Sequence, residues 1–236
     1  MRIHRTGTTL RLSALLLAVT AVLAGCSSDS QKATTSPEDT LAAAKTHLDE
    51  TSGVRIGLTT KKLPAGVNGL LAADGVATHA PAFQGAIKVA ASGVTADASV
   101  VAVNGVVHAK LPFTSRFVRI NPADYGAPDP ADLMNRKGGL SSLLTAARDV
   151  KEGDKVRQGK VVLSTYTATV PGRAVAAIIP SANASADFDA EFTVTDQDQL
   201  AKTVLTGPFY PGAGDVTYTI TFDDYGIKRK ITAPPS

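Results

Sequence analysis

Apolar and polar residues alternate with a period of two from residue 54 onward, and this alternation constrains the fold more than any other feature. Val54, Ile56 and Leu58 begin the pattern, and residues 83–89 repeat it. Alternation of this kind places successive side chains on opposite faces of a strand. We also expect strands resuming at Val150 and over residues 70–79, 94–103, 106–111 (extended by 117–120), 160–170, 187–195, 200–206, 216–222 and 226–232.

The connections between these segments are short and rich in turn residues. Asn104-Gly105 is the strongest hairpin signal, because both residues tolerate the positive φ angles of a two-residue turn. Strands that follow one another through hairpins pair antiparallel, whereas parallel pairs need long crossovers. We therefore predict about ten or eleven strands in one large antiparallel sheet of an α+β protein.

About four helical segments accompany the strands. Ser36-Pro37 followed by two acidic residues is a typical helix start, and Ser52-Gly53 ends that helix. Residues 140–147 carry a narrow apolar stripe, and residues 172–179 form an apolar segment that Pro180 stops. A shorter capped helix is expected at residues 129–134.

The N-terminus resembles a bacterial export signal. Arg2, Arg5 and Arg11 precede 14 uncharged residues, 12–25, which as a helix extend about 21 Å, too short for a bilayer core of about 30 Å. The run ends in Leu-Ala-Gly before Cys26, a pattern similar to a lipobox. We predict a signal peptide at 1–25, a diacylglycerol on Cys26, a flexible tether over 26–36 and one domain at 37–236. An ordinary signal peptide followed by a free Cys26 is the alternative.

Removal of the signal leaves no excess of charge. Its three arginines are cationic and it has no acidic residue, so the remaining 21 cationic residues equal the 21 acidic ones. A neutral chain offers no argument for nucleic-acid binding. The single Cys excludes an internal disulfide, and the absence of Trp leaves Val, Ala, Leu and Ile to build the core.

The sequence lacks the patterns of common catalytic and metal sites. His47, His79 and His108 are far apart and lack metal-ligand spacing. There is no nucleophile elbow, phosphate loop or dinucleotide fingerprint, and we expect neither an enzyme nor a cofactor or metal site.

The apolar face of the sheet is aliphatic, with few aromatic residues. Such a lining suits acyl chains better than sugars, whose sites generally use flat aromatic platforms and convergent polar groups. Composition alone favours the alternative that the helices simply fill the core.

A series of short segments resembles the LppX/LprAFG family of mycobacterial and related actinobacterial lipoproteins, most of all its LprG branch. Besides the lipobox, the resemblance rests on residues 52–56, 85–89, 94–98, 103–111, 129–133, 139–144, 200–202 and 234–235. It extends over essentially the whole chain, and the hairpin at 103–111 is its clearest segment.

The resemblance implies a half-barrel of antiparallel strands with helices on its concave side around a large hydrophobic cavity. It implies a protein, without enzymatic activity, on the outer face of the cell membrane that carries di- or triacylated glycolipids or triacylglycerol between envelope layers. A membrane transporter is an expected partner, and we expect a monomer.

Alternation and the apolar stripes nominate the residues that line this cavity. On the strands they are Ile56, Leu58, Ile87, Val89, Val101, Val103 and Val107; on the helices they are Leu140, Leu143, Leu144, Val175, Ile178 and Ile179.

Two other interpretations of the sequence compete with a lipid carrier. One is a scaffold lipoprotein with a filled core that supports a transporter or envelope assembly; the other is a binding protein for a small polar solute, disfavoured by the antiparallel strands.

Overall fold

The computed structural model describes residues 35–112 and 114–235. Residues 35–236 form one compact unit. The predicted signal peptide and Cys26 lie outside the described residues. None of the helices in the described part is long and apolar enough to cross a membrane.

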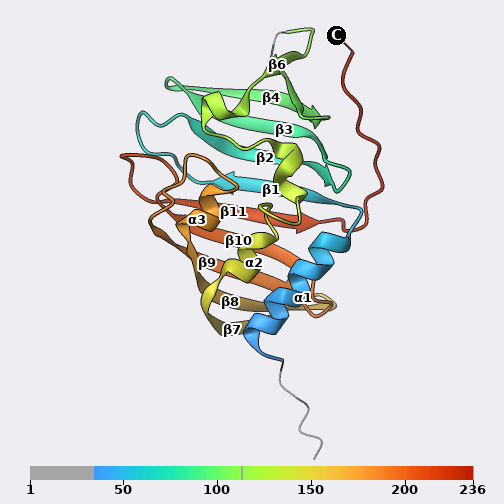
Figure 1. The fold of residues 1–236 in the computed structure, drawn as a ribbon, viewed down its shortest axis with the longest axis vertical. Coiled ribbons are helices and arrows are strands. Elements are labelled where there is room, and N and C mark those ends of the chain that lie inside the picture. Colours follow the sequence, from blue (N-terminus) through green and yellow to red (C-terminus); the bar gives the residue numbers. More distant parts are fainter. Residues whose placement is uncertain (1–34, 113, 236) are drawn as a thin grey trace, which may run out of the picture. The chain divides into compact units, whose positions relative to one another are not determined.

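Eleven strands of this unit form one antiparallel sheet, which confirms the predicted α+β fold (Figure 1). The strands are β1 (Gly53–Thr60), β2 (Gly69–Thr78), β3 (Ala82–Ala91), β4 (Val94–Val103), β5 (Val106–Lys110), β6 (Val118–Ile120), β7 (Arg148–Gln158), β8 (Val161–Pro171), β9 (Asp187–Thr195), β10 (Leu200–Gly207) and β11 (Val216–Asp223). Their order is β6-β5-β4-β3-β2-β1-β11-β10-β9-β8-β7. Two meanders therefore join through the pairing of β1 with β11.

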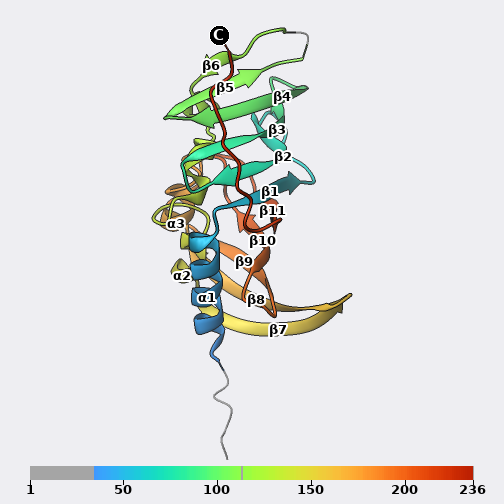
Figure 2. The ribbon, with the colours of Figure 1, turned by 90° about the vertical axis from the view of Figure 1, so that its right-hand side faces the viewer.

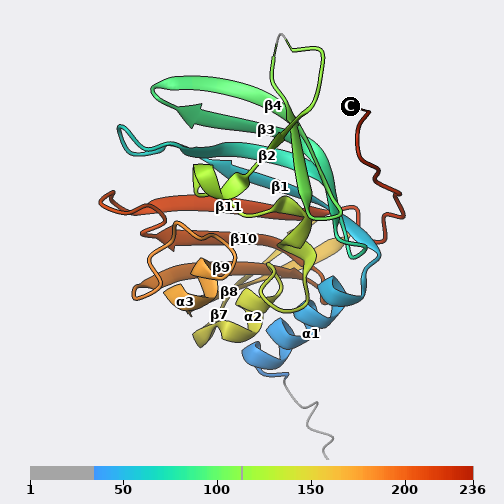
Figure 3. The same cartoon turned by 45° about the horizontal axis from the view of Figure 1, so that its top comes forward.

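The helical segments all lie against one face of the curved sheet, called here the helix-bearing face (Figures 2 and 3). They are α1 (Pro37–Glu50), α2 (Ser142–Ala146), α3 (Gly172–Ala176) and the 3₁₀ helices η1 (Pro122–Tyr125) and η2 (Pro130–Met134). The predicted start of α1 is confirmed, because the Ser36 Oγ accepts a hydrogen bond of 3.0 Å from the Asp39 amide. Both α2 and α3 are shorter than predicted.

The predicted strand over residues 226–232 is wrong. The amides of Gly226 and Ile227 both donate to the Gly53 carbonyl, and the chain then leaves the sheet as a C-terminal tail. The physical reason is that β1 already pairs with β2 on one side and with β11 on the other, so no edge is open beside it.

Aromatic side chains anchor the helix-bearing face near β9–β11. Phe188, Phe209 and Tyr218 are buried and stack edge to face, with ring centroids 4.9 and 5.0 Å apart. The Tyr218 hydroxyl bonds to the Leu70 carbonyl at 2.8 Å and to the Tyr210 hydroxyl at 2.7 Å. Burial and then the bond with Tyr210 raise the pKa of Tyr218 well above its ordinary value.

Two glycines on this face leave room for an aromatic ring to pack closely against the sheet. A Cβ on Gly75 or on its cross-strand partner Gly85 would lie 2.5 or 2.8 Å from the Phe83 ring. The ring therefore occupies the room that these two glycines leave. Glycine here indicates a filled core and not an empty lining.

Candidate functional site

Most strand residues predicted to line the cavity share the helix-bearing face. Ile56 pairs with Phe222 and Leu58 with Ile220, so both point to the same side as the buried aromatic residues of β11. On β3, residues 83, 87 and 89 share that face by alternation. Val107 also belongs to it, since its partner Ala102 pairs with Phe83.

Val101 and Val103 are the exceptions. The prediction that they line the same cavity as Val107 is wrong, because they lie on the opposite face of the sheet. The turn at Asn104-Gly105 has two residues with positive φ, 57° and 69°, so Val103 pairs directly with Val106. Directly paired residues share a face, whereas Val107 is the next residue along and points the other way. On the helix-free face, Val101 and Val103 pack in a separate cluster with Ala82 and Ile231.

The helical residues predicted for the wall are packed into the main core. Leu140, Leu143, Leu144, Val175 and Ile178 are buried in one cluster with the strand residues. Ile179, Leu58 and Ile87 are half-buried against that cluster, and Val89 is half-buried outside it. These residues therefore meet between the helices and the sheet and fill much of the space there; their role in lining a lipid cavity stays a prediction.

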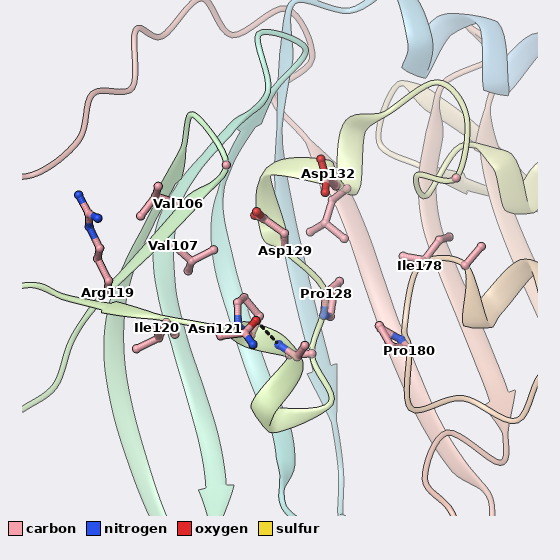
Figure 4. A pocket seen from close by; sticks show the side chains of 17 residues that line it. Val106, Val107, Arg119, Ile120, Asn121, Pro128, Asp129, Asp132, Ile178 and Pro180 are labelled. Carbon is pink, nitrogen blue, oxygen red and sulfur yellow. Dashed lines mark hydrogen bonds between the residues drawn. The ribbon is translucent and has the colours of Figure 1, made fainter.

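An open pocket of about 550 Å³ remains at one end of this face, between the β5–β6 edge, the two 3₁₀ helices and the end of α3 (Figure 4). Val107, Ile120, Leu133 and Ile178 supply its aliphatic wall. Asn121, Asp129 and Asp132 contribute polar groups to the lining. A site that combines an apolar wall with a few polar groups suits an amphipathic ligand.

Proline and capping residues shape the outer wall of this pocket. Asn121 and Asp129 each precede a proline and cap η1 and η2, with the Asp129 carboxylate 2.9 Å from the Ala131 amide. The Ser181 hydroxyl donates to the Gly126 carbonyl at 3.1 Å, which ties the segment after α3 to the connection between η1 and η2. The wall is thus fixed by two local caps and by one hydrogen bond between distant segments.

Two acidic side chains of the pocket lining are engaged in hydrogen bonds close by in the chain. The Asp129 carboxylate caps η2, and the Asp132 carboxylate accepts from the side-chain amide of Asn135 at 3.0 Å. Within residues 35–112 and 114–235, no group of three or more His, Cys, Asp or Glu side chains is placed to hold a metal ion.

Of the predicted lining residues, Val107 and Ile178 line this pocket. Ile120, Leu133 and the prolines Pro128 and Pro180 were missed. The signal that identifies them is the run of capped Asn-Pro and Asp-Pro pairs over 121–130, which folds this segment back over the sheet.

A second hollow of about 410 Å³ lies on the helix-free face across β11, β1, β2 and β3. Its surface includes Gly57, Ala72, Ala86 and Thr219. It is bordered by exposed ion pairs, Arg55–Asp74 at 2.7 Å and Lys88–Asp97 at 3.1 Å. The lining of this hollow is mostly apolar, and charged side chains stand at its border. Exposed ion pairs of this kind contribute little free energy.

The fold is similar to that of two crystal structures of mycobacterial lipoproteins. LprF from Mycobacterium bovis has a TM-score of 0.69 at 14% identity, over 85% of this chain and 97% of that chain. LppX from Mycobacterium tuberculosis has a TM-score of 0.61 at 12% identity, over 83% of this chain and 98% of that chain. At these identities the likeness concerns the fold alone. No curated protein matches the sequence.

The family model described as LppX_LprAFG lipoprotein matches residues 36–229, which include all the helices and strands described above. The predicted place in the LprG branch stays a prediction, since the two similar structures are LprF and LppX. With most of its length matched by this model, the chain belongs to the LppX/LprAFG family of lipoproteins.

Proposed function

We propose that the protein binds acyl chains of a di- or triacylated glycolipid or of triacylglycerol and carries them between layers of the cell envelope. The observation that carries the proposal is the pocket on the helix-bearing face, where an aliphatic wall adjoins polar groups. An amphiphile placed there buries its chain against Val107, Ile120 and Ile178 and keeps its polar group beside Asn121 and Asp129.

The size of the pocket bounds what it holds. At about 30 Å³ for a group the size of a methylene or a water molecule, 550 Å³ holds about 18 such groups, or one acyl chain. A second or third chain needs more room between helices and sheet. Helices α2 and α3 have five residues each, short enough that packing and not helix propensity holds them in place. Their displacement is the route that we propose for further chains.

The energetic requirement on a carrier is burial alone. Moving a chain of about 16 carbons from a bilayer into water costs on the order of 12 kcal/mol at about 0.8 kcal/mol per methylene. A protein that buries the chain to a similar extent offsets that cost without chemistry. We accordingly propose a binding protein and not an enzyme.

The proposed location follows from the N-terminal sequence. We propose export by the signal at 1–25 and anchoring on the outer face of the cell membrane through a lipid on Cys26. Two acyl chains hold a protein on a membrane firmly, and the segment 26–36 links them to the folded domain. A membrane transporter is the proposed protein partner, with the chain itself a monomer.

A scaffold role is the second candidate, and one observation favours it. Leu143, Leu144 and Val175 are buried in the main core, and the pocket lining does not include them. In that case the protein would support a transporter or envelope assembly and carry no lipid.

Native mass spectrometry of residues 35–236, exported by an actinobacterial host and extracted with organic solvent, tests the proposal. Residues 35–236 form a compact unit, so this part of the chain contains the whole proposed site. We expect about one di- or triacyl lipid per protein. A lipid-free protein that also takes up no added glycolipid would refute the carrier and leave the scaffold.

A further inference from the structure

Two segments of the chain that contain no acidic residue meet at the β6 end of the sheet. Residues 105–123 carry Lys110, Arg116 and Arg119, and residues 225–236 carry the consecutive cations Lys228, Arg229 and Lys230. The six side chains are called here the cationic surface. The chain without its signal is neutral, so this separation of charge is local and strong.

Packing fixes the tail against β3 and β4, next to the connection that leads into β6. After the tail leaves the sheet at Gly53, Ile231 is buried against Val101 and Val103, with Phe117 packed on the same cluster. The Lys110 ammonium lies 5.9 Å from the centroid of the Phe117 ring. Figures 1 and 2 both show the tail running from β11 toward β6.

The strand cations of this surface lie on the helix-free face of the sheet. Arg119 pairs with His108, whose other partner is Val101, so Arg119 projects from the helix-free face. Figure 4 shows its side chain directed away from the other labelled lining residues. Arg119 and the next residue, Ile120, both contribute to the pocket lining, so the cationic surface borders the pocket.

The six cations take no part in the ion pairs of the described residues. Those pairs use Lys45, Arg55, Lys88, Arg148, Lys155 and Lys202. Asp223 and Asp224, the acidic residues nearest the tail in sequence, act on Arg55 and raise its pKa, after the larger effect of Asp74. The surface therefore keeps its positive charge for an external partner.

Exposed aliphatic side chains accompany these charges. Leu111 is 47% exposed and Val118 is 52% exposed, at the two ends of the connection between β5 and β6. Val118 pairs with Ala109, whose other partner is Val100, so its side chain lies on the helix-bearing face of the β6 edge and Arg119 lies on the other. An edge that carries cations and exposed aliphatic groups matches an anionic bilayer, which attracts the charges and accepts the apolar groups at its interface.

From this combination we infer that the cationic surface, with Leu111 and Val118, docks the protein on an anionic phospholipid bilayer beside the mouth of the pocket. The docking does not depend on the cargo. It goes beyond the proposed anchor on Cys26, because it uses the folded domain.

The test measures binding of residues 35–236 to vesicles of phosphatidylcholine, alone or mixed with phosphatidylglycerol. We expect binding to the mixed vesicles only, weakened by salt because screening shortens from about 10 Å at 0.1 M to about 3 Å at 1 M. Substituting Lys228, Arg229 and Lys230 together by Ala should lower the partition coefficient about 100-fold, since each surface cation contributes roughly fivefold.

The matched control removes three cations from the other edge of the sheet, by Ala at Lys151, Arg157 and Lys160 of the exposed β7–β8 hairpin. The two triple variants have the same net charge by design. Equal thermal midpoints would show that they are also equally stable and can be compared. The control should bind like the parent chain. Equal binding by both triple variants, or no binding of the parent to mixed vesicles, would overturn the inference.

A second readout follows from the absence of Trp in the chain, because one introduced Trp reports its own surroundings. Leu111→Trp should shift its emission to the blue on mixed vesicles. Val156→Trp, at a site 57% exposed on the β7–β8 hairpin, should not shift. The reverse pattern would assign docking to the other end of the sheet and overturn the inference.

Discussion

Ala177→Trp tests whether the pocket at the end of α3 binds an acyl chain. Ala177 is exposed, lines the pocket and follows α3 with φ of −64°, so a larger residue meets no backbone strain. The indole ring should enter the 550 Å³ space without disturbing the core. We expect lipid binding to fall while the folded state keeps its stability.

The expected loss follows from methylene burial. If the ring displaces only about three methylenes of the ligand, the lost burial is about 2.4 kcal/mol at ~0.8 kcal/mol each, which lowers affinity roughly 50-fold. The pocket holds about 18 groups of methylene size, so this displacement is modest for its volume. A larger displacement would lower affinity further.

The assay is equilibrium binding of a pyrene-labelled diacyl phospholipid to residues 35–236, together with thermal unfolding. Ala184→Trp is the matched control, since Ala184 is exposed between α3 and β9 and does not line the pocket. The control should bind as the parent chain does. Unchanged lipid affinity in Ala177→Trp, with an unchanged thermal midpoint, would refute the assignment of the pocket.

Three further predictions concern stability. Leu144→Ala should lower the free energy of unfolding in urea by about 2–5 kcal/mol, because Leu144 is buried in the main core; a loss below about 1 kcal/mol would indicate an open lining instead. The free energy of unfolding should fall above pH 10, because burial raises the pKa of buried Tyr218 and half-buried Tyr225 in the folded state, so that only the unfolded chain ionises these phenols; an equally steep fall in Tyr218→Phe would contradict this role. Ser36→Ala should cost about 1 kcal/mol by removing the cap of α1, whereas Ser36→Asp should keep the stability; equal losses in both would argue against capping.

Alternation and turn chemistry predicted most of the sheet, because both act locally. Residues 54–58 and 83–89 alternate and lie in β1 and β3 as expected. Asn104-Gly105 forms the predicted two-residue turn. The same turn also determines that Val103 and Val107 point to opposite faces, and counting residues across it predicts this from sequence alone.

The ends of the expected helices were harder to predict than the strands, because a stripe of leucines does not indicate where a short helix ends. The turn before α2 is closed by the Leu140 amide bonding to the Leu133 carbonyl, a contact between segments that sequence periodicity does not show. After Ala146 the chain passes at once into β7. Tertiary contacts thus shorten a helix whose apolar pattern extends over 140–147.

The pocket was the least predictable feature, because it is built from segments far apart in the chain. Ile120 and Leu133 come from the segment after β6, whereas Ile178 follows α3. Each is an ordinary aliphatic residue in its own segment. Only the pairing of β6 with β5 and the tie between Ser181 and Gly126 bring them to one place.

Photo-crosslinking with a lipid that carries a diazirine in its acyl chain tests the central claim most directly. The lipid is bound to residues 35–236, irradiated, and the modified peptides are located by mass spectrometry. The account predicts adducts at Val107, Ile120, Leu133 and Ile178, lost in Ala177→Trp and kept in Ala184→Trp. Adducts confined to the helix-free face, or spread over the surface without saturation, would contradict it.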